Sequence, residues 1–181
     1  MKILNVGSGS KPLMSKSGHI VHNFDLPSDD AGKHHRGEQS HVDIFGNAID
    51  MRMIRPNVYD LVTFVHSLEH MPYPSLALLE ARRVLKDDGH IFIEIPDAKK
   101  VGKERREHLY SWSNWSINNL CRECGYNRLK EAHMEKMLAK ADLWYKHKPN
   151  IHMYSLKHPN LRYYGERREG WVFNELWRIP Y

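Results

Sequence analysis

Short apolar runs alternate along this chain with stretches of helical periodicity, and this alternation limits the fold more than any other feature. Runs suited to buried strands occupy residues 2–6, 19–25, 41–44, 59–66 and 89–96. Between Pro74 and Asp87 the apolar residues recur at helical spacing, and Ser75 is the expected N-cap. Strands that alternate with helices predict an α/β fold, a three-layer sandwich around a mostly parallel sheet.

The second half of the chain continues the pattern with one clear helix. Its apolar stripe consists of Ile117, Leu120, Cys121 and Cys124. Gly125 follows where a left-handed C-terminal residue belongs, and residues 126–132 begin as a strand. We expect the two cysteines to be core residues and the last strand to occupy 171–179.

The segment 133–170 is the least regular part of the sequence. It is rich in Lys, His and Tyr, and we expect a helix within 134–145 followed by a long loop. Loops of such length often carry function. We therefore predict a single domain over 1–181 in which 133–170 is an insertion that covers the substrate side.

The composition of the chain says more about its expected compartment and partners than about its activity. The chain has 181 residues and a formal net charge of +5, which weakly favours an anionic substrate or partner. It contains no apolar run of about 18 residues, so we expect no membrane partner. The N-terminal run is expected to be a buried strand rather than a signal peptide, and two cysteines do not make a disulfide framework. We expect a cytoplasmic protein.

Three successive strand ends carry residues suited to a nucleoside cofactor. Gly7, Ser8 and Gly9 follow the first strand, and such glycines let a backbone turn tightly and approach a ligand. Asp25 ends the second strand, where a carboxylate can accept hydrogen bonds from ribose hydroxyls. Asp43 follows the third and is placed to read an adenine amino group. Each aspartate could instead serve an ordinary turn. The indication of a cofactor site therefore comes from the occurrence of all three features at successive strand ends.

In order, the motifs "ILNVGSGS", "HNFDL", "HVDI", "YDLVTFVHSLEHM" and "LLEARRVLKDDGHIFIEIPD" resemble those of class I S-adenosylmethionine-dependent methyltransferases. The resemblance covers about residues 2–131 plus the final strand. It implies a seven-stranded Rossmann-like sheet with the last strand antiparallel, S-adenosylmethionine as cofactor, and Ile44, Val65 and His66 as further cofactor contacts. The chain departs from the family at Asn5, usually acidic, and at Lys11, usually glycine, and its first helix is shortened or lost.

The segment "HSLEH" carries the candidate catalytic residues. His66, Glu69 and His70 follow the fourth strand, and in a helical turn these positions share one face. Two interpretations stay open. The three side chains could bind a divalent metal, or a histidine with a pKa near 6.5 could act as a general base toward a hydroxyl. A metal is the less favoured of the two.

The sequence therefore predicts a methyltransferase that acts on oxygen or nitrogen of a small molecule, a sugar or another glycan precursor. The alternative is a methyltransferase-like binding module that no longer catalyses. Nucleic-acid methylation is less favoured. It relies on net basicity and on the mixture of Arg, Tyr and Trp in residues 160–171, which fits single-stranded nucleic acid.

Overall fold

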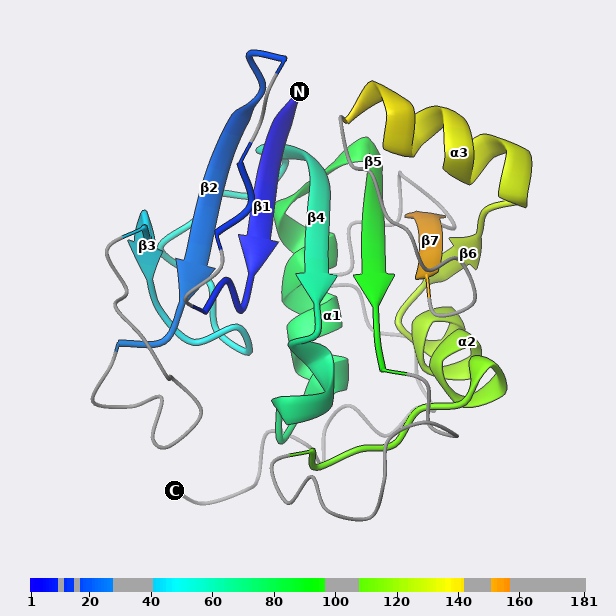
Figure 1. Cartoon of the computed structure of the whole chain (residues 1–181). Helices are drawn as coiled ribbons and strands as arrows, with labels where there is room; N and C mark the ends of the chain where they lie inside the picture. Colours follow the sequence, from blue (N-terminus) through cyan, green and yellow to red (C-terminus); the bar gives the residue numbers. More distant parts are fainter. Residues whose placement is uncertain (10–11, 15–16, 28–40, 97–107, 142–150, 157–181) are drawn as a thin grey trace, which may run out of the picture.

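A computed structural model of the chain describes residues 1–9, 12–14, 17–27, 41–96, 108–141 and 151–156. Its strands form one seven-stranded sheet in the order β3-β2-β1-β4-β5-β7-β6 (Figure 1). The strands are β1 (Lys2–Val6), β2 (Ile20–Asp25), β3 (Ile44–Phe45), β4 (Tyr59–Val65), β5 (Leu85–Glu94), β6 (Tyr126–Arg128) and β7 (Ile151–Leu156). The pairings among β1 to β5 are parallel, and β7 runs antiparallel to both β5 and β6. The expected fold class, with its antiparallel last strand, is confirmed.

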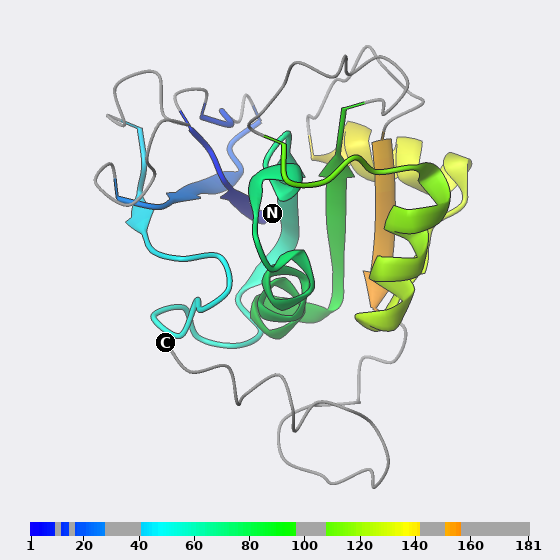
Figure 2. The same ribbon diagram turned by 90° about the horizontal axis from the view of Figure 1, so that it is seen from below.

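The helices cover both faces of this sheet. Helices α1 (Pro74–Val84) and α2 (Asn114–Glu123) lie on one face, and α3 (Glu131–Lys140) lies on the other (Figure 2). On the α1–α2 face, Val62 and Phe64 belong to the larger apolar cluster together with Ala77 and Ile117. The smaller cluster on the other face includes Leu61, Phe92 and Met153, with Met134 of α3 packed against it. The alternation along β4 therefore produces a core on each side of the sheet.

The second half differs from the expectation in its last strand. The strand that enters the sheet between β5 and β6 is 151–156, which lies inside the segment expected to be a loop. The strand expected at 171–179 lies outside the described residues. Because α3 and β7 are parts of the fold itself, only 142–150 and 157–170 are left as the expected cover, and these lie outside the described residues.

The predicted ends of two helices can be compared with the structure. Helix α1 begins at Pro74, with Tyr73 at the cap position, so the prediction of Ser75 as N-cap was wrong. Proline suits the first helical position because its missing N–H needs no partner there. Cys121 and Cys124 are buried and free, and Gly125 has a φ of 84°, so the prediction for this helix end is confirmed.

The connection between β1 and β2 explains the role of Asn5. None of the described residues between these strands is helical. Leu13 donates its backbone N–H to Asn23 Oδ1 (2.9 Å), and its carbonyl accepts from Asn23 Nδ2 (3.3 Å). Asn23 Oδ1 also accepts from Asn5 (3.0 Å), and Asn5 accepts from Thr63 (3.0 Å). Buried side chains of three strands thus hold Leu13, in the connection where the resemblance predicts a shortened or lost helix.

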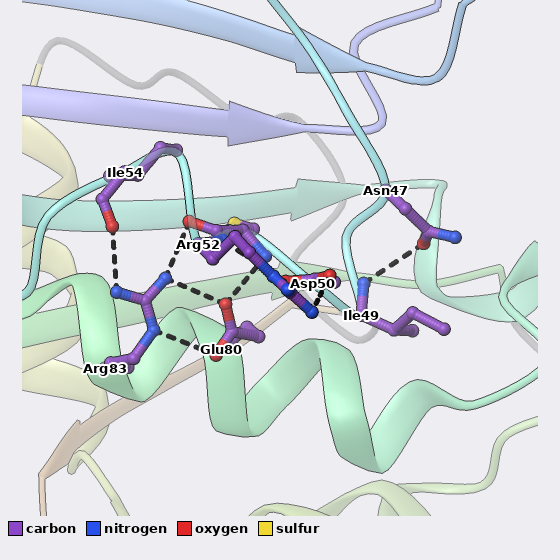
Figure 3. A network of polar contacts seen from close by, with 8 residues as sticks. Asn47, Ile49, Asp50, Arg52, Ile54, Glu80 and Arg83 are labelled. Carbon is purple, nitrogen blue, oxygen red and sulfur yellow. Dashed lines mark hydrogen bonds and ion pairs between the residues drawn. The ribbon is translucent and has the colours of Figure 1, made fainter.

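A second polar network ties α1 to the segment before β4 (Figure 3). Arg83 donates to the carbonyls of Met51 (2.7 Å) and Ile54 (2.8 Å) and pairs with Glu80 (2.8 Å). Glu80 in turn accepts the Met51 N–H (2.7 Å). The two side chains are 13% and 14% exposed, so most of this network is shielded from water. It fixes the chain that leads from β3 into β4.

No helix in the described part of the chain is both long enough and apolar enough to span a membrane.

Candidate cofactor and active site

The glycine loop continues the pairing of β1 with β2. The N–H groups of Gly7 and Ser8 both donate to the Phe24 carbonyl, at 2.9 and 3.2 Å. Gly7 has a φ of 73°, and a Cβ there would overlap the Ser67 side chain, so only glycine fits. Gly9 has a φ of 55°, yet a Cβ there would meet no atom within 4 Å. The loop is therefore tightly packed at Gly7 and open at Gly9.

Asp25 lies at the carboxyl end of β2 against this loop. Its Oδ2 accepts the Gly9 N–H, and its Oδ1 accepts the Leu26 N–H at 2.8 Å. The side chain is buried, at 6% exposed. The structure thus brings together Gly9 and Asp25, two residues that the sequence assigned to one cofactor site. The contact of Asp25 with ribose stays a prediction.

Asp43 has a clear structural use. Its Oδ2 accepts the Asn23 N–H at 2.7 Å, and its own N–H donates to the Asn23 carbonyl at 2.8 Å. The carboxylate thereby replaces one strand residue in the pairing of β2 with β3, which shortens β3 to Ile44–Phe45. Asp43 also lines a cavity of about 340 Å³ over β2, together with His19 and His41. Its contact with adenine stays a prediction.

Ile44 and Val65, the two apolar residues expected at the cofactor, pack against the core. Ile44 contacts the larger cluster on the α1–α2 face, and Val65 contacts the smaller cluster on the α3 face. Their roles as cofactor contacts stay predictions.

His66 directly follows β4 and has an unusual electrostatic setting. Its φ is 49°, and its side chain is 52% exposed. Nδ1 lies 3.7 Å from Glu69 Oε1, and Nε2 lies 3.5 Å from Glu94 Oε1. The carboxylates of Glu69 and Glu94 raise the pKa of His66 to about 9. One interpretation of the sequence was a histidine base with a pKa near 6.5. For His66 that value is corrected to about 9, because two anions stabilise the imidazolium.

Glu69 and His70 lie in a short 3-10 helix, Leu68–His70, after β4. Glu69 is 1% exposed, and His70 Nε2 lies 3.9 Å from Glu69 Oε1. A histidine from far along the chain, His108, joins them: one ligand atom from each of the three residues lies within 4.8 Å of the others. The rings of His70 and His108 meet edge to face, with centroids 4.8 Å apart. The structure thus brings His108 to Glu69 and His70, whereas His66 lies between Glu69 and Glu94.

Two residues of this site were missed by the sequence analysis. Glu94 ends β5, so the reasoning about acidic residues at strand ends that singled out Asp25 could also have found it. His108 lies beyond β5, and no local spacing connects it to Glu69; only the fold shows their proximity.

Comparison with known proteins agrees with this architecture. Residues 1–148 match a family described as "Methyltransferase domain". The match covers most of the chain, including the glycine loop, Asp25 and the "HSLEH" segment. This chain belongs to that methyltransferase domain family.

The curated relatives are more distant. The chain is 34% identical over 120 residues to a ubiquinone biosynthesis O-methyltransferase from Nitrosomonas europaea, which covers 60% of this chain and 47% of the relative. A protein of the same name from Vibrio atlanticus is 31% identical over 98 residues, covering 50% of this chain and 41% of the relative. The chain thus spans less than half the length of these relatives.

Solved structures support the fold alone. An S-adenosylmethionine-dependent methyltransferase from Archaeoglobus fulgidus superposes with a TM-score of 0.59 at 14% identity, covering 84% of each chain. One from Aquifex aeolicus superposes with a TM-score of 0.53 at 16% identity, covering 72% of this chain and 74% of the other.

The residues present fit the cofactor that the family implies. Gly9 leaves open space, Asp25 offers a buried carboxylate beside it, and Ser8 Oγ is a buried hydroxyl without a hydrogen-bond partner among the described residues. S-adenosylmethionine carries no phosphate, so this loop needs no helix N-terminus as an anion site.

Proposed function

We propose that this chain binds S-adenosylmethionine at the carboxyl ends of β1, β2 and β4 and transfers the methyl group to oxygen or nitrogen of a small-molecule acceptor. The observation that carries this proposal is the contact of Asp25 with the Gly9 N–H. It lies at the carboxyl ends of β1 and β2, next to the junction of β1 with β4 where the strand order reverses, and ligands of open α/β sheets bind at such switch points.

The cofactor would supply an activated methyl group, so the chain itself must mainly hold and orient the acceptor. Gly7, Ser8, Gly9 and Asp25 would hold the cofactor. His66, Glu69 and His70 follow the neighbouring strand and would face the acceptor. A charged His66 between two carboxylates could hold an acceptor oxygen by donating a hydrogen bond to it.

Oxygen is the acceptor atom we favour. The two curated relatives described above are named as O-methyltransferases. The rim of the site is also apolar and aromatic: Tyr110 stacks on Trp112 with centroids 5.0 Å apart, and Leu109 is 59% exposed. Such a surface suits a planar small molecule better than a glycan precursor.

Calorimetry with S-adenosylmethionine and S-adenosylhomocysteine tests the proposal. We expect one site per chain that binds both compounds, and weaker binding at that site in Asp25→Ala. Methyl transfer to simple phenols, followed by mass spectrometry, tests the acceptor class. A chain that binds neither compound would contradict the proposal. One that binds both and methylates nothing in a broad acceptor screen would favour the binding-module alternative.

The remaining expectations stand as proposals. We propose the cytoplasm as the compartment, in keeping with the two free cysteines. Nucleic acid is the less favoured acceptor, and the basic and aromatic segment 160–171 that motivated it lies outside the described residues.

A further inference from the structure

Glu69 is the most unusual buried group in the described part of the chain. Its side chain is 1% exposed, and neither carboxylate oxygen has a hydrogen-bond partner among the described residues. His66 Nδ1 lies 3.7 Å and His70 Nε2 lies 3.9 Å from Glu69 Oε1, and both distances are too long for good hydrogen bonds. A buried carboxylate without close partners is costly, so a native structure that keeps one calls for an explanation.

Two histidines lie around this carboxylate. The ligand atoms of Glu69, His70 and His108 are all within 4.8 Å of one another. His70 and His108 meet edge to face, so their ring nitrogens are close without the rings being stacked. We propose that Glu69, His70 and His108 bind one divalent transition-metal cation, for which Zn²⁺ is the best match.

The backbone holds this arrangement in place. The Glu69 carbonyl accepts hydrogen bonds from the N–H groups of Leu109 (2.9 Å) and Tyr110 (3.2 Å). Tyr110 also donates its hydroxyl to the Pro72 carbonyl at 2.9 Å. The residue that offers the carboxylate therefore also anchors the segment that carries His108. This is the kind of support that a metal site needs around its ligands.

The donor set decides the class of cation. Two imidazoles and one carboxylate suit Zn²⁺ and similar ions, whereas Mg²⁺ and Ca²⁺ prefer oxygen ligands. Tetrahedral ligands at about 2.0–2.1 Å from zinc lie roughly 3.3 Å apart. The 3.9 Å between His70 Nε2 and Glu69 Oε1 would therefore close by about 0.6 Å on binding, and the ligand atoms farthest apart, within 4.8 Å, by up to about 1.5 Å.

His66 is outside this ligand set, in contrast to the metal interpretation of the sequence. It lies between Glu69 and Glu94 and is half exposed. Three protein ligands leave at least one position open on a zinc ion, as in catalytic zinc sites. In the proposed function, on which this step rests, a hydroxyl of the acceptor takes that position. Its O–H bond breaks, the electron pair stays on oxygen, and the proton passes to solvent water, because a bound cation lowers the pKa of a hydroxyl ligand.

The test uses the full chain stripped with a chelator and then titrated with Zn²⁺ alone, and with Co²⁺ alone as a spectroscopic probe. We expect one equivalent of Zn²⁺ per chain and a cobalt absorption spectrum typical of mixed nitrogen and oxygen ligands. His108→Ala should weaken Zn²⁺ binding at least about 100-fold, since loss of an outer partner alone costs about 10–100-fold. Glu69→Gln should do the same. His133→Ala, an exposed histidine on α3, is the matched control and should bind like wild type.

A melting experiment covers variants that fold poorly. Zn²⁺ should raise the melting temperature of wild type and of His133→Ala, and leave that of His108→Ala unchanged. Equal Zn²⁺ affinity in wild type and His108→Ala would overturn the site, as would a wild type that binds no equivalent. Calorimetry with S-adenosylhomocysteine separates the two proposals. Zinc binding without cofactor binding removes the proposed function and keeps the metal site, and the reverse result removes only the metal site.

Discussion

The carboxylate of Asp25 accepts a hydrogen bond from the backbone N–H of Gly9 and so joins the end of β2 to the loop after β1. Both residues are held by neighbouring contacts, Asp25 through Leu26 and the loop through the Phe24 carbonyl. A ligand that reaches this edge of the sheet meets a fixed backbone and a fixed carboxylate. The contact therefore makes Asp25 the most informative residue for the proposed cofactor site.

Asp25→Ala should weaken binding of S-adenosylhomocysteine by about 1.5–3 kcal/mol, the range for a hydrogen bond to a charged group. Calorimetry measures this directly, and a thermal melt shows how much of the loss comes from a loosened loop. Asp87→Ala removes an exposed carboxylate and should bind like wild type. Unchanged affinity in Asp25→Ala would refute its assignment to the ribose.

The second prediction concerns Arg83, whose guanidinium holds two carbonyls and Glu80 in a mostly buried network (Figure 3). Arg83→Met should lower the free energy of unfolding by about 3 kcal/mol, because it leaves the Glu80 carboxylate without its cation. Denaturant unfolding measures the loss. Arg52→Met is the matched control, since its pair with Asp50 is 84% and 45% exposed and should contribute less than about 1 kcal/mol. Similar losses in both variants would contradict the role of burial.

The fold was largely predictable because its signals are local. The alternation of strands and helices is written in the spacing of apolar residues, and this holds for β1, β2, β4 and α1. Strand β7 was not predicted because its buried positions include His152 and Tyr154, which do not form an apolar run in the sequence. Its place is decided by pairing with β5 and β6 rather than by its own sequence.

The sequence predicted only those parts of the site whose residues are close together in the chain or stand at strand ends. Helical spacing placed His66 on one face with Glu69 and His70, and strand ends pointed to Asp25. His108 could not be found in this way, because it follows β5 whereas Glu69 and His70 follow β4, and no sequence spacing links them. Asn5 was noted as a departure from the family. Its role in supporting the connection between β1 and β2 becomes clear only from its contact with Asn23, which also holds Leu13.

The third prediction concerns the charge of His66. In protein freed of metal, nuclear magnetic resonance should find its pKa near 9, because Glu69 and Glu94 stabilise the imidazolium. Glu94→Gln removes one of these anions and should move the pKa down toward the ordinary value near 6.5. Glu123→Gln, an exposed carboxylate on α2, should leave it unchanged. A wild-type pKa close to 6.5 would show that the two carboxylates do not act on this imidazole.

The last prediction concerns His152 of β7, a buried histidine that titrates far from neutrality. It is 1% exposed, and neither ring nitrogen has a hydrogen-bond partner among the described residues. Burial, with a smaller contribution from the charge of Arg128, lowers its pKa to about 4. In the unfolded chain the same group has a pKa near 6.5. Between these two values the unfolded state binds more protons than the folded state, so stability must fall as pH falls through this window.

The loss attributable to His152 should reach about 3 kcal/mol near pH 4, since each unit of pKa difference corresponds to about 1.4 kcal/mol. His152→Phe keeps a planar ring but cannot take up a proton. Denaturant unfolding of both proteins from pH 7.5 to pH 4.5 should therefore show a steeper decline for wild type than for the variant. His133→Ala should decline like wild type, because it removes an exposed side chain of α3 and leaves the buried imidazole of His152 in place. Parallel declines in wild type and His152→Phe would mean that the buried imidazole is protonated in the folded chain, with its charge stabilised by water or by a group outside the described residues.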